Sequence, residues 1–486
     1  MKKHFLSLLF LLGLIILVWH KVLNLSITGE GYWYFLNGFE GGALALRFDV
    51  GAEIIMGILE YVFKDNILLY QGFILVVWIA ICLLFYFFVF ELTDNKKIAI
   101  IASILFSINF GTTYEMLGMG AYQNFLQRVL FLILLLPSFI FFVKFYKTQK
   151  FKYSFLSLSF FIIAILSAHF NVFFLPFILA YIGSLLILEK KSRKKTVLLA
   201  IHALFFISIS MIIIYSALLL GVASYIKGPG FISFLFNNTT SIFYHSFRQL
   251  IYLTIPFNAV SGILFSFDEN WKHNMQPLYI LVSLFYIFAF IYSFKKVKKL
   301  RALLLASFLF LPASFVLNMY MRAENVQYLE SGSRYLFVPS MGFSIFFGIF
   351  LYAISNINKL KAITYMAILC WCLIQVTVVW QEIDKDYYKH LAIKKSIAHI
   401  KEISPTLLPH SYVLTPSIVG PWGAAFCKKY YGKQDITYIA MGAPEITWEK
   451  SFGRVFNPKQ DIIFNYDYQK EQIVDRTKEY KKIIIE

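Results

Sequence analysis

The chain has 486 residues, of which 59% are hydrophobic and 19% aromatic, and its mean hydropathy is +0.67. A soluble protein of this length cannot bury so much apolar surface, so the composition excludes the soluble classes and predicts a polytopic membrane protein. The formal net charge of +18 is gathered into short clusters between apolar runs, which excludes nucleic-acid binding as its explanation.

Eleven apolar runs predict an all-α bundle with about 11 transmembrane helices. About 20 apolar residues cross a hydrocarbon core of about 30 Å, and backbone groups in lipid must pair within their own segment. No small-residue cleavage site follows the first run, which predicts an uncleaved helix. The runs cover residues 5–20, 67–91, 98–111, 125–145, 154–169, 172–188, 196–219, 277–294, 302–320, 335–355 and 362–380.

The basic clusters predict how the bundle is oriented. Twenty of the 29 Lys and Arg of residues 1–380 fall in alternate loops, near residues 2–3, 96–97, 144–152, 190–195, 295–301 and 359–361. Positive charge favours the cytoplasmic side and its anionic lipids. We therefore expect a multi-pass protein, in the plasma membrane by preference, with its N-terminus in the cytoplasm and its C-terminal part outside.

The longer segments between runs predict the remaining architecture. The first outer loop, 21–66, and the large outer loop, 220–276, contain apolar residues at helical spacing with few charges, which is typical of interfacial helices at the outer membrane surface. The chain after residue 380 has a helical opening followed by three short β-like runs, 411–416, 435–441 and 461–466. We expect a membrane domain over 1–380 and a small soluble α/β domain over 381–486.

The stretch "SGSRYLFVPSMGF" places Arg334 at the outer start of the tenth run. A guanidinium offers a planar fork of donors that suits a phosphate, but a basic side chain at a helix start also serves as a plain interfacial anchor. The residues alone leave both interpretations open.

This stretch resembles the R-Y-L-(Y/F)-(L/V)-P-S signature of GT-C membrane glycosyltransferases, particularly of protein O-mannosyltransferase-like members. The long first outer loop, "ILFSINFGTTYEMLGMGAYQNFLQRVLFL", "AILSAHFNVFFLPFILAY" and the soluble tail are also similar to parts of this family. The resemblance implies an enzyme that takes a sugar from a polyprenyl-phosphate carrier outside the membrane. The resemblance also implies that Arg334 binds the phosphate of that carrier.

The same resemblance implies a catalytic base on the first outer loop. The best positional match is Glu30, where the family usually has Asp, and Asp49 is the reserve candidate. Either carboxylate can take the proton of an acceptor hydroxyl if it lies within hydrogen-bond reach. Both residues also fit the ordinary interpretation of a solvated loop acid or a helix cap.

Five further residues are candidates of the second rank. Tyr335 is either an interfacial aromatic or a second donor to the phosphate, and Arg128 is either an anchor or part of the phosphate site. His169, His245 and Arg248 are candidates to line the substrate groove, with a backbone-satisfied histidine and a solvated helix face as the alternatives. No set of metal ligands is recognisable, so we predict no metal site and leave a divalent cation as an open alternative.

The sequence therefore predicts a membrane glycosyltransferase. Its partners would be a polyprenyl-phosphate-linked sugar donor, a protein or glycan acceptor and membrane lipid, but no nucleic acid. The alternatives are a flippase or transporter of lipid-linked saccharides and a polymerase or ligase of such saccharides. Transporters place their charges near the midplane and show internal repeats, whereas here the charges gather at the outer edge.

Overall fold

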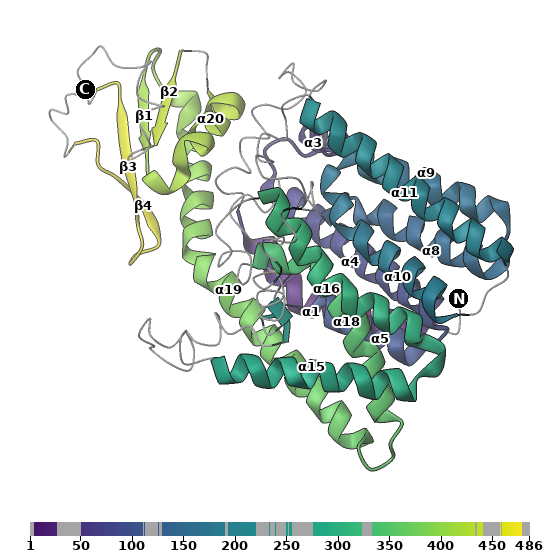
Figure 1. Ribbon diagram of the computed structural model, residues 1–486. Coiled ribbons are helices and arrows are strands. Elements are labelled where there is room, and N and C mark those ends of the chain that lie inside the picture. Colours follow the sequence, from purple (N-terminus) through teal and green to yellow (C-terminus); the bar gives the residue numbers. More distant parts are fainter. Residues whose placement is uncertain are drawn as a thin grey trace.

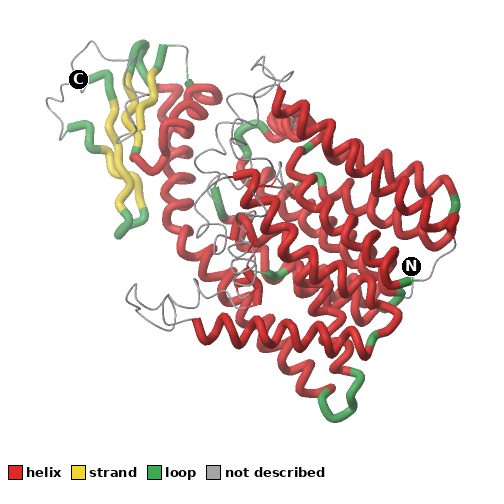
Figure 2. The backbone as a smooth tube through the Cα atoms, viewed as in Figure 1, coloured by secondary structure: helices red, strands yellow, loops and turns green. Residues whose placement is uncertain are grey.

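The structure, a computed structural model, describes residues 4–26, 50–109, 111, 125, 129–189, 193–219, 233, 239, 249, 250, 252–254, 276–322, 333–432, 435–440, 457 and 459–478. It is a bundle of helices with a small sheet on one side (Figure 1), and helices make up most of the described chain (Figure 2). The helices before the sheet are α1 (Phe5–Trp19), α3 (Val50–Phe63), α4 (Ile67–Thr93), α5 (Lys96–Ser107), α8 (Leu132–Thr148), α9 (Phe151–Ser167), α10 (Leu175–Leu188), α11 (Arg193–Leu219), α15 (Gln276–Lys296), α16 (Arg301–Arg322), α18 (Ser333–Ser355) and α19 (Lys361–Ile403). Short 3₁₀ helices are η2 (His20–Asn24), η6 (His169–Phe174) and η7 (Lys298–Leu300).

Each of the eleven predicted runs overlaps one of these helices. Within the described residues, seven helices are long and apolar enough to cross a membrane, over 5–24, 67–93, 171–188, 195–212, 298–316, 336–355 and 361–406. The chain is therefore a multi-pass helical membrane protein, and the count of about eleven spans stays a prediction. The starts differ most at the run 125–145, where α8 begins at Leu132 and continues to Thr148 before Gln149 turns left-handed with φ 57°.

Helix α18 is the centre of the bundle. In its apolar window 83% of the residues are buried, against 28% in α1 and 22% in α11. Small residues allow this position, because Gly348 lies against Ala102 of α5 and Gly342 against Phe310 of α16, where a side chain would clash. Close packing of this kind holds helices together where lipid supplies no hydrophobic driving force between them.

One end of the bundle gathers Lys and Arg side chains, and we call it the basic end. Lys144 lies 3.5 Å from Glu91, and Lys147 lies 2.7 Å from Asp94 where α4 ends. The Tyr146 hydroxyl donates to Glu189 after α10, over 2.8 Å. These contacts bring three of the chain's turns together, as the alternation of the basic clusters predicts.

Helix α19 runs from the basic end to the sheet as one helix of 43 residues, roughly 64 Å long at 1.5 Å per residue. We expected a span over 362–380 and a separate helix after it. The structure joins the two because no Gly or Pro interrupts residues 361–403, and the helix ends just before Pro405. The predicted boundary at residue 380 thus falls inside α19, and the division into two domains stays a prediction.

The residues after Trp380 form what we call the C-terminal unit, which comprises the second half of α19 and the elements that follow it. These are η8 (Ser404–Thr406), β1 (Tyr412–Thr415), η9 (Ser417–Val419), α20 (Gly420–Tyr431), β2 (Thr437–Ala440), β3 (Ile462–Asp467) and β4 (Gln472–Asp475). The strand order is β2-β1-β3-β4, with β1 parallel to β2 and to β3 and with β4 antiparallel to β3. Strands β1 and β2 lie within the first two predicted β-like runs, and β3 overlaps the third and ends one residue beyond it. Helix α20 supplies the crossover that a parallel pair requires.

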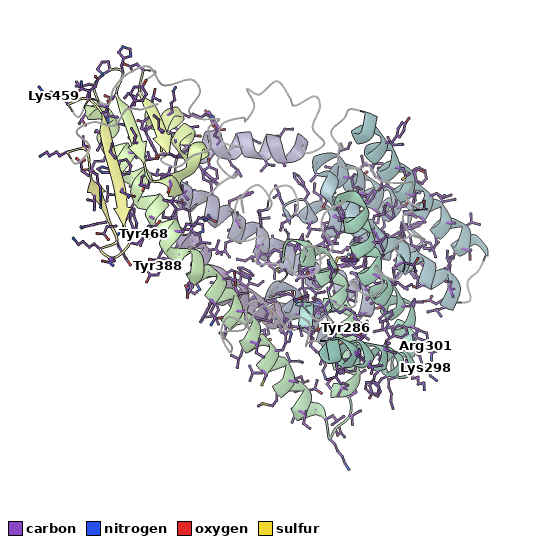
Figure 3. All side chains as sticks on the ribbon, turned by 60° about the vertical axis from the view of Figure 1, so that its left-hand side comes forward. Tyr286, Lys298, Arg301, Tyr388, Lys459 and Tyr468 are labelled. Atoms are coloured by element: carbon purple, nitrogen blue, oxygen red, sulfur yellow. The ribbon has the colours of Figure 1, made fainter. Side chains whose placement is uncertain are left out.

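The sheet rests on α19. The ring of His399 meets that of Phe464 edge-on at 5.0 Å, and the hydroxyls of Ser404 and Tyr438 lie 2.7 Å apart. Figure 3 labels Lys459 and Tyr468 on this side of the molecule and Lys298 and Arg301 on the other. We call the end of the bundle that faces the C-terminal unit the sheet end.

Candidate functional site

Three of the eight predicted site residues lie within described helices. Arg334 and Tyr335 belong to the first turn of α18, and His169 opens η6. The other five, Glu30, Asp49, Arg128, His245 and Arg248, lie outside the described residues. The described elements that flank these positions define the candidate site.

The start of α18 is packed against the end of α5. Leu336 and Phe337, which follow Tyr335, are fully buried. A Cβ added to Gly111 would lie 2.9 Å from the Leu336 Cβ, so the chain after α5 passes very close to α18. The buried Asn109 side chain fixes this passage by accepting from the Gly111 N–H over 2.7 Å and donating to the Leu253 carbonyl over 3.1 Å. The backbone at Arg334 is thereby held within one helical turn of a rigid contact.

Trp78 of α4 joins the start of α18 to the end of α1. Its ring centroid lies 6.3 Å from that of Phe337 and 6.5 Å from that of Trp19, the last residue of α1. The Trp19 indole N–H in turn donates to the Ser107 carbonyl at the end of α5, over 2.9 Å. Buried aromatic contacts of this kind fix helix ends firmly relative to one another. The chain that leads towards Glu30 thus leaves the bundle at the same end at which Arg334 enters it.

The 3₁₀ helix η6 reaches the same place. The ring of its last residue, Phe174, meets that of Phe337 edge-on at 5.9 Å. The buried Asn171 side chain donates to the Ala164 carbonyl of α9 over 2.8 Å and ties the turn to the preceding helix. The backbone of His169, five residues before Phe174, belongs to this turn.

The start of α3 is pressed against the end of α9. A Cβ added to Gly51 would lie 2.4 Å from the Ser167 Cβ and 2.8 Å from the Ser167 Cα, so only glycine fits. Gly51 follows Asp49 by two residues, and Ser167 precedes His169 by two. This contact places the start of α3 beside the end of α9, which leads directly into η6.

Charged contacts tie both flanks of the segment 27–49 to the C-terminal unit. On the first flank, Lys21 lies 2.7 Å from Asp384 and the Ser26 N–H donates to His390 Nδ1 over 3.0 Å. On the second flank, Glu60 accepts from the Nζ of Lys429 and, over 2.9 Å, from the hydroxyl of Tyr430.

Asp65, in the turn after α3, completes these contacts. Its carboxylate accepts from Lys401 of α19 over 2.6 Å and from the Tyr431 hydroxyl of α20 over 3.1 Å. Burial raises the pKa of Asp65, but the two hydrogen bonds and the charge of Lys401 lower it, and the net pKa lies below the usual 3.8. Burial raises the pKa of Tyr430, and its hydrogen bond to Glu60 raises it further, so this hydroxyl stays protonated and donates.

The sequence interpretation missed these acceptors and donors. Glu60 and Asp65 stand at the end of the first predicted outer loop, and their partners lie about 340–370 residues away. The run "KKYY" at 428–431, two lysines followed by two tyrosines, is the local sequence feature that could have indicated a binding site for carboxylates. Among the described residues, no group of three or more His, Cys, Asp or Glu side chains is placed to hold a metal ion.

The fold defines a multi-pass helical membrane protein in which the flanks of several predicted site residues meet at the sheet end. No family model and no curated protein matches the sequence. Among solved structures, the chain is similar to the oligosaccharyltransferase of Archaeoglobus fulgidus, crystallised with a disulfide-tethered acceptor peptide that contains the NVT sequon, at 13% identity and a TM-score of 0.46. The match covers 91% of this chain and 64% of the archaeal chain, so this chain spans less than two thirds of the length of the archaeal one.

Proposed function

We propose that the protein is a membrane glycosyltransferase that moves a sugar from a polyprenyl-phosphate carrier to an acceptor at the sheet end of the bundle. The observation that carries this proposal is the set of contacts around Phe337, which brings the start of α18, the end of α1 and η6 together. In the proposal, this end faces away from the cytoplasm and the basic end faces it.

Arg334 holds the carrier phosphate in this proposal. The guanidinium is permanently charged and forms paired hydrogen bonds to phosphate oxygens. As the sugar leaves, negative charge grows on the carrier phosphate, and a fixed cation at that position lowers the energy of the transition state. The signature around Arg334 and its rigidly packed neighbours Leu336 and Phe337 support this role. Tyr335 and Arg128 are the second donors to test.

A carboxylate of the segment 27–49 acts as the base. The close approach of Gly51 to Ser167 supports Asp49, because Asp49 directly precedes α3 in the sequence and the start of α3 lies beside the end of α9. The family resemblance supports Glu30. The carboxylate takes the acceptor's proton, the acceptor oxygen bonds to the anomeric carbon, and the bond from that carbon to the phosphate oxygen breaks with its electrons on the phosphate. The acceptor in this proposal is a protein or glycan, and His169, His245 and Arg248 are candidates for contact with the substrates.

The test is sugar release from a labelled carrier. Reconstituted protein receives a radiolabelled polyprenyl-phosphate sugar and acceptor peptides or glycans, and Arg334→Ala, Asp49→Asn and Glu30→Gln are compared with wild type. We expect Arg334→Ala and one of the two carboxylate variants to lose transfer by about 100-fold or more.

Matched controls are Lys298→Ala at the basic end and Glu402→Gln on the exposed face of α19, which should keep wild-type rates. Equal release by all variants would refute the transferase proposal. Movement of intact donor across the bilayer without sugar release would identify a flippase instead. If Asp49→Asn is inactive and Glu30→Gln is active, Asp49 is the base.

A further inference from the structure

Helix α3 is held at both of its ends by parts of the chain that are remote in sequence. At its first turn Gly51 is pressed against Ser167 of α9. At its last turn Glu60 is bound by α20, and Asp65, two residues after the helix, is bound by α19 and α20. A helix of 14 residues is roughly 21 Å long, so α3 is a short rod with both ends fixed.

The attachment at the last turn of α3 consists of two carboxylates that are each paired with a lysine and a tyrosine. Each carboxylate accepts from one lysine and one tyrosine, and each lysine also lies over the ring of the tyrosine that shares its carboxylate. Glu60 and Asp65 are shielded, with side chains 17% and 25% exposed. Partly buried, hydrogen-bonded pairs are screened less by salt than exposed pairs, and the ring contacts restrict the lysines further. We call this attachment the latch, and its members are Glu60, Asp65, Lys401, Lys429, Tyr430 and Tyr431.

The latch is one of two attachments of the C-terminal unit to the same part of the chain. Lys21 and Ser26, before the segment 27–49, contact Asp384 and His390 of α19. The latch lies after that segment. The C-terminal unit therefore contacts the chain on both sides of the stretch that contains the proposed base.

We propose that the C-terminal unit is a positioning element for α3, with Lys429 and Lys401 as the positioning residues that act through Glu60 and Asp65. This inference rests on the proposed function in one respect, because α3 begins directly after Asp49. A cation that fixes the far end of α3 is expected to fix the start of the same helix, which follows Asp49 directly in the sequence. Misplacement of a reacting group by about 1 Å can cost about 100-fold in rate, so a loose latch is expected to lower transfer.

The test of the latch itself needs no activity. Spin labels are placed at Tyr61→Cys on α3 and Leu408→Cys on the C-terminal unit, two positions with 85% and 54% exposure, after the exposed Cys370 and the partly exposed Cys372 are changed to Ser. Pulsed dipolar spectroscopy in nanodiscs then gives the distance distribution. We expect one narrow distribution in wild type and a broad or shifted one in Lys429→Glu.

Two variants make this result specific to the pair. Lys428→Glu makes the same charge change at the adjacent, exposed residue and should leave the distribution narrow. The exchange Glu60→Lys with Lys429→Glu restores opposite charges at the two positions and should narrow the distribution again. An unchanged distribution in Lys429→Glu, or no recovery in the exchange, overturns the latch.

The activity arm tests positioning. We expect Lys429→Glu to lower kcat about 10-fold and the exchange to restore it, because the latch positions the base. The KM for the donor lipid should change little, because the donor phosphate is bound elsewhere. A broadened distribution with unchanged kcat overturns positioning. If wild type transfers no sugar while the distances still respond as expected, the latch stands and the proposed function fails.

Discussion

Gly51→Ala tests the closest approach that the structure contains near the candidate site. In an isolated helix this change stabilises by about 1 kcal/mol, because alanine is the better helix former. Here the new Cβ would lie 2.4 Å from the Ser167 Cβ and 2.8 Å from the Ser167 Cα. Carbon atoms pack at about 3.5 Å, so α3 and α9 must separate by roughly 1 Å, and no rotation of the Ser167 side chain relieves the contact with its Cα.

The expected net effect is a loss of about 1–2 kcal/mol. Overpacking of this kind costs about 1–3 kcal/mol, and the gain in helix propensity offsets part of it. Thermal unfolding in detergent measures the change, and Gly72→Ala in α4 is the matched control because open space surrounds Gly72. The control should be neutral or slightly stabilised, since it gains helix propensity without a clash.

A double-mutant cycle with Ser167→Gly isolates the contact. Ser167→Gly removes the nearest two of the three clashing atoms, so Gly51→Ala should cost less in that background, with a coupling of at least about 0.5 kcal/mol. If Gly51→Ala melts at or above the wild-type temperature, α3 does not lie against Ser167, and the support for Asp49 as the base is lost. Additive effects of the two changes would lead to the same conclusion.

The remaining predictions concern packing, charge and orientation. Phe337→Ala should destabilise by about 3 kcal/mol, because it empties a fully buried position between three helices and η6, whereas the exposed Phe288→Ala should cost little in the same melt. The lowered pKa of Asp65 means that its contribution to stability is present above the unfolded value of 3.8 and is lost as the pH falls through the still lower folded value. Asp65→Asn should therefore destabilise by about 0.5–1 kcal/mol near neutral pH, and an equal loss at pH 3 would contradict the assignment. In intact cells an impermeant maleimide should label Tyr468→Cys, and Lys298→Cys only after permeabilisation; the reverse pattern would invert the proposed orientation (Figure 3).

Local patterns predicted the positions of the helices well. Each of the eleven apolar runs overlaps a helix of the structure, because the residues of a membrane-crossing helix are contiguous in the sequence. They failed where a boundary depends on something other than hydropathy. Hydropathy falls after Trp380, yet α19 continues through residue 403, because helix propensity does not follow hydropathy and residues 381–403 contain no Gly or Pro.

The candidate site shows the opposite case. The signature around Arg334 could be read from sequence, but nothing near Arg334 indicates that Trp78 links its helix to the end of α1. The latch joins residues more than 300 positions apart, and a surface acid such as Glu60 looks like any other until its partner is known. Such pairs depend on how the helices are arranged, which one sequence does not specify locally.

The unbroken course of α19 makes the C-terminal unit sensitive to the bilayer. The 23 residues beyond Trp380 extend roughly 34 Å, so a change of 10° in the tilt of the membrane-embedded half moves the far end by roughly 6 Å. Helices adjust their tilt to the thickness of the surrounding hydrocarbon. A change in lipid thickness would then change the tilt of α19 and displace the latch residues at its far end. The distribution of distances between labels at Tyr61 and Leu408 should broaden or shift in thin bilayers. If the label distance is constant across lipids of different acyl-chain length, the other contacts of α19 keep its tilt fixed.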